Sequence, residues 1–414
     1  MSPISGRGLE NIAFTGEGIF DGSGEAWRHV KRFKMTDSQW KELLGSGGVT
    51  NEKGNVWYPS EGFKIGAEGG REGEHELIKD YLRPVMFSLV ECKNVLLDGP
   101  VFQNSPAWCI HPLMCENLTV RNVDVRNPWY SQNGDGIDIE SCTNSVIYNC
   151  TFDVGDDAIC IKSGRDKAGR DRGIPTENII VKNCVVYHGH GGVTVGSEMS
   201  GGVRNMHVSD CTFIGTDVGL RFKSNRGRGG VVEKIFISNI DMIKIPTNAI
   251  SFNLYYGGLS VSEMLAMEED GSEPVEIPPV SEETPQFKDI SIKSIRCKGA
   301  LQALYLQGLP EMNLENVILE DLIMEAENGL ICMDADGLII RDLNLVTDNL
   351  PALTFYNSKN VLIEGLVLPE SGETMIAVSG SESANISINT DVNMDADQFL
   401  DLDEKVNPGA VTIQ

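Results

Sequence analysis

Asn144-Ser-Val-Ile-Tyr-Asn149 is one copy of a pattern that recurs along the chain. In each copy an Asn is followed by alternating apolar residues and then by a second Asn or Asp. Period-two alternation is typical of a β-strand with one buried face. Other clear copies are Asn117-Leu-Thr-Val-Arg-Asn122, Asn178-Ile-Ile-Val-Lys-Asn183 and Asn205-Met-His-Val-Ser-Asp210. Further copies begin near Lys234, Asp289, Asn316 and Asn360, with a degenerate copy at Asn385.

The spacing of these copies predicts an all-β solenoid. Most copies lie between 25 and 34 residues apart, and Gly or Asn stands at the expected corners. Short strands at such a period indicate a parallel β-helix, in which stacked coils bury one continuous core. A β-propeller would need a longer, more regular period with antiparallel hairpins. Only Asp37–Leu44 has the pattern of an amphipathic helix, so we expect one β-helix domain over residues 1–414.

Composition agrees with a large core and excludes some classes of protein. Apolar residues make up 41% of the 414 residues, and 44 glycines are available for corners. No run of 18 apolar residues exists, so we expect no membrane partner. The chain opens abruptly at Met1-Ser2-Pro3, with strand-like residues by Asn11. Because solenoids are usually capped, we expect residues to be missing upstream, and a secretion signal could be among them.

The ten cysteines do not suggest a metal site. Cys150, Cys184 and Cys211 each follow the second Asn or Asp of a repeat, which predicts a ladder of small buried residues. Because neighbouring strands lie ~5 Å apart, the spacing permits a disulfide between two of these cysteines, but we expect buried thiols. No Cys-x-x-Cys occurs, and we expect no zinc, no other metal and no cofactor.

Two short strings predict a cluster of carboxylates. They are Asn133-Gly134-Asp135-Gly136-Ile137-Asp138 and Gly155-Asp156-Asp157-Ala158-Ile159. Aligning Ile137 with Ile159 places Asp135 on Asp157, and Asp156 falls one step earlier. Gly-Asp pairs are also ordinary turn residues. Their shared register instead favours three acids in one patch, as glycoside hydrolysis requires.

Continuing this alignment brings further side chains to the same face. Val193 and Val195 match Ile159 and Ile161, which places His190 above Asp156. Leu220 and Phe222 continue the inward row, so Arg221 and Lys223 point outward. By the same alignment Trp108, His111, Tyr255 and Tyr305 also reach this face.

The charge pattern predicts an anionic ligand. The net charge of −26 argues against a nucleic-acid partner. Basic residues nevertheless cluster near the acids: Lys162, Arg165, Lys167, Arg170, Arg172, Arg221, Lys223, Arg226 and Arg228. Because the forked donors of Arg suit carboxylates, this zone indicates an acidic ligand at that point.

Four ordered motifs carry a family resemblance. Asn133-Gly134-Asp135, Gly155-Asp156-Asp157, Gly189-His190-Gly191 and Arg221-Phe222-Lys223 resemble the motifs of glycoside hydrolase family 28, the polygalacturonases. The resemblance covers roughly residues 9 to 395. The departures are Gly134 for Thr and Phe222 for Ile. Gly16–Gly22, Ser105–Pro112 and Ser224–Gly230 also resemble pieces of the bacterial exo-acting branch.

The resemblance implies a right-handed, single-stranded parallel β-helix of the pectin-lyase-like type. It implies inverting hydrolysis of α-1,4 bonds to galacturonic acid in pectic polysaccharide. Asp156 would be the general acid, Asp135 and Asp157 would position and deprotonate the water, and His190 would support Asp156. Arg221 and Lys223 would bind the substrate carboxylate. Further substrate-binding candidates are Asn133, His111 and Trp108, with Tyr255 or Tyr305 as the family's tyrosine.

Spacing and insertions suggest how the site would work. Inversion needs carboxyls ~6.5–9.5 Å apart and retention ~5 Å. We expect Asp156 to splay away and open the gap for water, and crowding to raise one pKa. Two insertions, Gln39–Arg83 and the acidic Gly257–Phe287, could wall off one end of a groove and so favour exo-action.

Two alternatives remain open. A pectate-lyase-like β-helix would also bind uronate but would eliminate with Ca²⁺, which clustered aspartates could hold. A non-catalytic carbohydrate-binding or adhesive solenoid would bind without cleavage. The main expectation is a monomer, secreted or periplasmic, acting on galacturonan.

Overall fold

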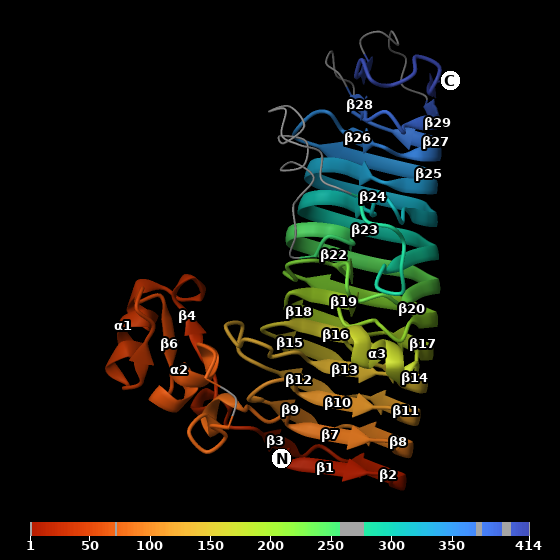
Figure 1. The fold of residues 1–414 in the computed structure, drawn as a ribbon. Helices are drawn as coiled ribbons and strands as arrows, with labels where there is room; N and C mark the ends of the chain where they lie inside the picture. The colour runs from red at the N-terminus through yellow and green to blue at the C-terminus, as the bar shows by residue number, and fades with distance from the viewer. Residues whose placement is uncertain (1, 71–72, 257–276, 370–374, 391–398, 414) are drawn as a thin grey trace.

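Most of the chain winds into a column of parallel strands. The computed structural model describes residues 2–70, 73–256, 277–369, 375–390 and 399–413. Within these residues, 28 strands join in one sheet whose pairings in the column are all parallel. The N-terminus lies at one end of the column and the C-terminus at the other (Figure 1). The predicted parallel β-helix is confirmed.

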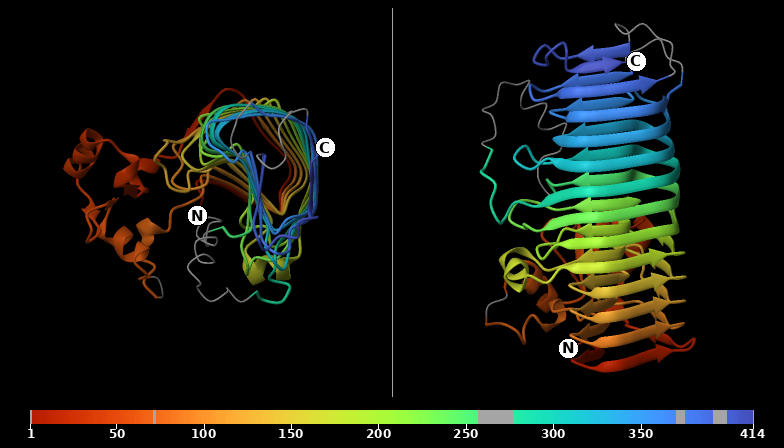
Figure 2. Two further views of the ribbon diagram at one scale, coloured as in Figure 1. Left: turned by 90° about the horizontal axis from the view of Figure 1, so that it is seen from above. Right: turned by 90° about the vertical axis from the view of Figure 1, so that its right-hand side faces the viewer.

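Seen along its axis, the column has three faces (Figure 2, left). The first face contains β1 (Ile4–Arg7), β7 (Phe87–Val90), β10 (Ile110–Leu113), β13 (Ile137–Glu140), β16 (Asp157–Lys162), β19 (Gly191–Gly196), β21 (Leu220–Lys223), β26 (Leu353–Tyr356), β28 (Ile376–Ser379) and β30 (Leu400–Leu402). The second contains β2 (Glu10–Thr15), β8 (Lys93–Asp98), β11 (Glu116–Arg121), β14 (Thr143–Tyr148), β17 (Thr176–Lys182), β29 (Ala384–Thr390) and β31 (Val411–Ile413). The third contains β3 (Ile19–Asp21), β9 (Val101–Gln103), β12 (Asp124–Arg126), β15 (Thr151–Val154) and β18 (Val185–His188).

The remaining strands of the column continue around corners and serve more than one face. They are β20 (Val203–Ile214), β22 (Val231–Asn253), β23 (Gln286–Gln307), β24 (Leu314–Met333), β25 (Ala335–Thr347) and β27 (Lys359–Val367).

The repeated Asn marks one corner of every coil. Asn117, Asn144 and Asn178 all have φ between 57° and 59°, in the left-handed region. Asn tolerates this conformation better than most residues because its short polar side chain bonds locally. Each side-chain amide donates to the Asn one coil back, for example Asn144 Nδ2 to Asn117 Oδ1 at 3.2 Å. The repeated Asn residues therefore form a hydrogen-bonded ladder along one corner of the column.

Inward apolar side chains stack from coil to coil and form the core. Ile137 pairs with Ile159, and Val193 pairs with both Ile159 and Leu220, as the alternation predicted. All ten cysteines are buried and free. Cys150, Cys184 and Cys211 thus pack as thiols.

A separate unit interrupts the column between β3 and β7, and we call residues 22–86 the insertion. It holds a three-stranded antiparallel sheet of β4 (Val30–Lys31), β5 (Val49–Thr50) and β6 (Val56–Tyr58). It also holds helices α1 (Asp37–Gly45) and α2 (Glu61–Ala67) and the 3₁₀ turns η1 (Gly24–Ala26), η2 (Arg32–Lys34) and η3 (Lys79–Tyr81). The insertion lies beside the column (Figures 1 and 2). It begins ahead of Gln39, because the chain leaves the column after Asp21.

The insertion has a core of its own that also contacts the column. Val30, Trp40 and Trp57 are buried together, and Tyr130 from the loop after β12 packs against them. Thr36 closes a capping box with Gln39 at the start of α1. Buried Arg28 donates to the carbonyl of Ser105 in the column. These contacts fix the insertion against the loops after β9 and β12.

The loop after β16 forms helix α3 (Asp166–Arg172). Of the second insertion, residues 257–276, including Glu263, Glu268, Glu269, Asp270, Glu273 and Glu276, lie outside the described residues. Among the helices that are described, none has the length and apolar character needed to cross a membrane.

Candidate active site

The carboxylates converge on the first face. Asp135 precedes β13, Asp156 precedes β16, and Asp157 begins β16 beside Gly191 of β19. One oxygen of each of these three acids lies within 4.8 Å of the others. Asp156 therefore does not splay away as expected, because its side chain turns back toward the other two.

Asp157 is held as an anion by two cations from the next coils. Arg221 Nη1 donates to Oδ1 at 3.0 Å, and Lys223 Nζ donates to Oδ2 at 2.6 Å. Burial alone would raise the pKa of Asp157. The charges of Lys223 and Arg221 outweigh burial, so its pKa lies well below the usual range. The site thus keeps one fixed negative charge.

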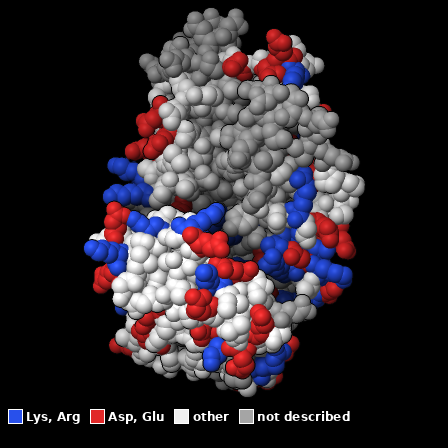
Figure 3. Space-filling model, turned by 60° about the vertical axis from the view of Figure 1, so that its left-hand side comes forward, with Lys and Arg blue, Asp and Glu red and all other residues white. Residues whose placement is uncertain are grey.

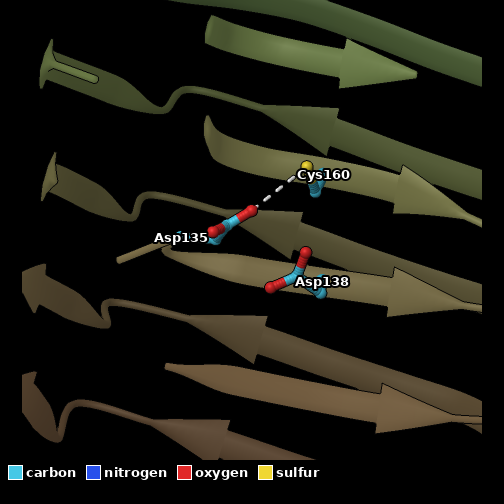
Figure 4. Close-up of side chains that lie close together, drawn as sticks. All are labelled: Asp135, Asp138 and Cys160. Atoms are coloured by element: carbon cyan, nitrogen blue, oxygen red, sulfur yellow. Dashed lines mark hydrogen bonds between the residues drawn. The ribbon is translucent and has the colours of Figure 1, made fainter. Parts of the chain in front are cut away.

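Asp135 is the acid that crowding pushes toward the protonated form. Burial raises its pKa, and Asp138 and Asp156 raise it further. Cys160 Sγ lies 3.8 Å from Asp135 Oδ2 and 3.6 Å from Asp157 Oδ2, as a weak thiol donor to both. Figure 4 shows Cys160 and Asp135 pointing toward one another beside Asp138. The expected raised pKa exists, but it falls on Asp135 and not on Asp156.

Behind these acids lies a buried pair that the motif analysis did not single out. Asp138 is fully buried, and neither carboxylate oxygen has a hydrogen-bond partner. Burial raises its pKa to about 6, although Lys162 Nζ, 3.5 Å away, pulls it down. Lys162 also lies over the ring of Trp108, 4.6 Å from its centroid. Asp138 follows Ile137 in the quoted string, so its outward position was already readable.

Asp156 lies at the edge of the cluster, with 19% of its side chain exposed. The backbone N–H of Asn133 donates to Oδ2 at 3.0 Å, and His190 Nδ1 lies 3.3 Å from Oδ1. Burial and the charge of Asp157 raise its pKa, but the hydrogen bond and charge of His190, with Lys223, shift it downward overall. Asp156 is therefore the triad member most accessible to a ligand.

The insertion delivers two cations to this edge. Lys34 Nζ lies 3.1 Å from His190 Nε2 and donates to the carbonyl of Gly155 at 3.4 Å. Arg83 donates to the side chain of Asn133 at 2.7 Å and to the carbonyl of Gln132 at 2.7 Å. Sequence reasoning missed both residues, since the insertion has no repeat to align.

Glycines keep space beside the acids. A Cβ on Gly191 would lie 2.1 Å from Thr194 Oγ1 and 2.9 Å from Asp157 Oδ1. A Cβ on Gly134 would lie 1.9 Å from Ser131 Oγ. Gly134, which replaces the family's Thr, thus makes room for Ser131.

The predicted aromatic residues and His111 are found in different settings. His111 Nε2 pairs with Glu140 at 2.9 Å, and its ring packs edge-on against Trp108. Tyr255 accepts from Arg226 at 3.2 Å. Tyr305 donates to Gln307 at 2.7 Å. The ring that meets the site cations belongs instead to Tyr256, 5.1 Å from Lys223 Nζ and 5.6 Å from the Arg221 guanidinium.

Most of the predicted basic zone is neutralised by nearby acids. Its outlying pairs are Arg165 and Arg228 with Asp166, Lys167 with Asp171, Arg170 with Glu283, Arg172 with Glu140, and Arg226 with Glu311. Arg221 and Lys223 contact Asp157, and Lys162 contacts Asp138. All nine cations of the predicted zone therefore already pair with an acid, and Arg221 and Lys223 are the ones that contact the triad.

The donor set does not fit calcium. Ca²⁺ takes 6–8 oxygen ligands. Here three carboxylates converge, but both oxygens of Asp157 already accept from Arg221 or Lys223. A cation would have to displace those two positive charges. The arrangement is better suited to proton transfer than to metal binding.

A cavity of about 620 Å³ lies between the insertion and the column, next to His190. Its lining includes Phe33 and Lys34 from the insertion and Trp129, His190 and Asp217 from the column. Figure 3 brings this side forward and shows Lys and Arg side chains gathered around a hollow. Gly155 and His190 of the site line this cavity, whereas the carboxylates of the triad are not part of its lining.

The profile of glycosyl hydrolases family 28 matches residues 2–262, which is more than half of the chain. The chain belongs to glycosyl hydrolase family 28. The four motifs fall within the matched residues. The family resemblance noted in the sequence is therefore confirmed.

Individual family 28 relatives agree with this placement. A probable polygalacturonase of Vitis vinifera is 30% identical over 201 residues, covering 48% of this chain and 38% of that protein. An exo-poly-alpha-D-galacturonosidase of Dickeya chrysanthemi is 25% identical over 262 residues, covering 60% and 40%. The matched part of this family 28 chain thus spans less than half of each relative.

Solved structures give the same fold. A hyperthermoactive exopolygalacturonase from Thermotoga maritima superposes with a TM-score of 0.62 at 28% identity, covering 84% of this chain and 72% of that one. A family 28 exopolygalacturonase of Yersinia enterocolitica superposes with a TM-score of 0.55 at 17% identity, covering 96% and 61%. At that identity the second match supports the fold alone.

Proposed function

We propose that this chain hydrolyses α-1,4 bonds between galacturonic acid units of pectic polysaccharide. The observation that carries the proposal is the convergence of three carboxylates within 4.8 Å, directly beside Arg221 and Lys223, in a family 28 chain. A neutral sugar would gain little from two buried cations, whereas a uronate carboxylate would bind them. The names of the polygalacturonase relatives support the same substrate.

Asp156 is proposed as the general acid. Of the triad it alone is partly exposed, with 19% of its side chain open to solvent, so a glycosidic oxygen can approach it most easily. Asp157 stays ionised beside its two cations, and Asp135 is buried with it. Because the three acids interact strongly, they titrate as one unit, and the proton must move to Asp156 when substrate binds.

Leaving-group chemistry tests this division of roles. Asp156→Asn should lower kcat on polygalacturonate by about 10²- to 10⁴-fold. The same variant should keep activity on a p-nitrophenyl galacturonide, whose leaving group departs without a proton. Asp135→Asn and Asp157→Asn should be impaired on both substrates. Equal losses for all three variants on both substrates would contradict the assignment of Asp156.

We further propose exo-action with inversion. The insertion beside the site and the exo-acting relatives support exo-action. Product sizing during digestion of polygalacturonate should show mono- or disaccharides from the start, and an early spread of oligomers would exclude exo-action.

NMR of the first product anomer decides between inversion and retention. An unsaturated product, or loss of activity in chelator, would indicate a lyase instead.

A monomeric β-helix acting in the periplasm or outside the cell fits this role, since pectin is a cell-wall polymer. Light scattering at assay concentration tests the oligomeric state. The bacterial exo-acting branch is likewise part of the proposal, because plant polygalacturonases match this chain as well.

A further inference from the structure

Lys34 makes the one contact by which the insertion touches the histidine of the site. Its Nζ lies 3.1 Å from His190 Nε2. An ammonium group has three donors and no lone pair, so the nitrogen it faces must accept. The proton of the imidazole then belongs on Nδ1, which lies 3.3 Å from Asp156 Oδ1. The geometry therefore selects one tautomer of His190.

The other groups around His190 agree with this tautomer. Asp217 Oδ2 lies 3.6 Å from Nε2, beyond a normal hydrogen bond, and balances the charge of Lys34. Arg221 Nη1 lies 3.4 Å from the carbonyl oxygen of His190, on the opposite side of the residue from the imidazole contacts. Burial lowers the pKa of Lys34, while Asp156 and Asp217 partly offset that effect. Lys34 and the carboxylates of Asp156 and Asp217 thus lie around the imidazole, whereas Arg221 contacts the backbone of His190.

We propose that Lys34 is a positioning residue that fixes the proton of the neutral His190 ring on Nδ1, facing Asp156. This rests on the proposed role of Asp156 as general acid. A neutral imidazole orients Asp156 by a hydrogen bond without adding a full positive charge. An imidazolium at the same distance would hold the carboxylate ionised and weaken it as an acid. The insertion is then part of the catalytic unit and not only a wall of the cleft.

Nitrogen NMR of the full chain with ¹⁵N-labelled histidine tests the proposal without substrate. His190→Gln identifies the signal of His190. In the parent protein that signal should report a neutral ring with the proton on Nδ1. Lys34→Met should move the proton of the neutral ring toward Nε2, where Asp217 accepts it.

Matched variants separate this role from general effects of the insertion. Lys41→Met removes the same charge from exposed α1 and should leave His190 unchanged. Lys34→Arg keeps the charge and should restore most of the parent behaviour. Asp217→Asn should retain the Nδ1 tautomer, because Lys34 still faces Nε2, which gives a reading even if Lys34→Met folds poorly.

On polygalacturonate, Lys34→Met should lower kcat about tenfold with KM within about twofold, because only proton transfer suffers. A tautomer of the neutral His190 ring in Lys34→Met that matches that of Lys41→Met would overturn the proposal. The NMR result does not depend on the substrate. Failure of the parent protein on galacturonan would count against the proposed function alone.

Discussion

Strands β16 and β17 belong to one coil, yet they bury their residues differently. β17 alternates buried and exposed positions, as a solvated face should. Every residue of β16 is buried, including Asp157 and Lys162. In both strands the side chains that point inward are apolar and stack on those of neighbouring coils. The difference lies outside, where the insertion, the loop after β12 and α3 stand over the first face. Charged side chains that point outward from the column and are nevertheless buried identify the site more clearly than any single sequence motif.

The largest expected effect comes from breaking the ion pairs of β16. Asp157→Asn leaves Lys223 and Arg221 buried without their anion, which should lower the free energy of unfolding by about 3–5 kcal/mol. Urea denaturation measures the loss. Asp157→Asn combined with Lys223→Met should recover part of the lost free energy of unfolding, because the unpaired positive charge of Lys223 has been removed. No recovery in the double variant would mean that the loss comes from packing and not from charge.

The next effect depends on pH. The pKa of Asp138 is raised by burial to about 6, above the unfolded value of 3.8. Its contribution to stability is therefore fully present below about pH 4 and is lost as pH rises through about 6. Asp138→Asn removes that loss, so the variant should gain stability relative to the parent between pH 4 and 7, by on the order of 2 kcal/mol. A stability difference that stays flat across this range would show that Asp138 is ionised throughout.

A smaller effect is expected at the asparagine corner. Asn144→Ala removes two ladder hydrogen bonds and forces Ala into the left-handed region at φ 57°. The expected cost is about 2 kcal/mol in thermal or urea unfolding. Asn144→Gly loses the same bonds without backbone strain and should cost about 1 kcal/mol less. Equal costs for Ala and Gly would assign the whole effect to the hydrogen bonds.

The smallest effect belongs to the exposed pairs of α3. Lys167 and Asp171 are four residues apart on the helix and largely in solvent. Lys167→Ala should change the free energy of unfolding by less than about 0.5 kcal/mol. A cost above 1 kcal/mol would mean that the outlying cations stabilise the protein as strongly as the buried ones, and the contrast between the two regions would fail.

The fold and the register were readable from the sequence because inward residues recur with period two. A slip of one residue would send Ile159 and Ile161 outward, so the alignment had only one stable solution. That alignment also placed Asp135, Asp157 and Arg221 on one face before any coordinates. The direction of Asp156 was misjudged, because its side chain turns back toward Asn133 and His190 and not along the strand.

What could not be predicted lies outside the repeat. Lys34 and Arg83 stand on the insertion, whose path depends on its own small core and not on any coil register. Tyr256 follows the end of β22, beyond the last residue that the alternation could orient. The predicted basic zone was misleading for a related reason. The sequence shows how many cations lie near the site, but only the structure shows which of them already pair with an acid.

The contact between Lys34 and His190 has a practical consequence for protein engineering. A shortened chain could keep all four motifs and a complete solenoid while lacking residues 22–86. Searches by motif would accept it as intact, yet His190 would have lost its contact with Lys34, and Asn133 its hydrogen bond from Arg83. Transferring this site to another β-helix would require transferring the insertion together with the strands that carry the motifs.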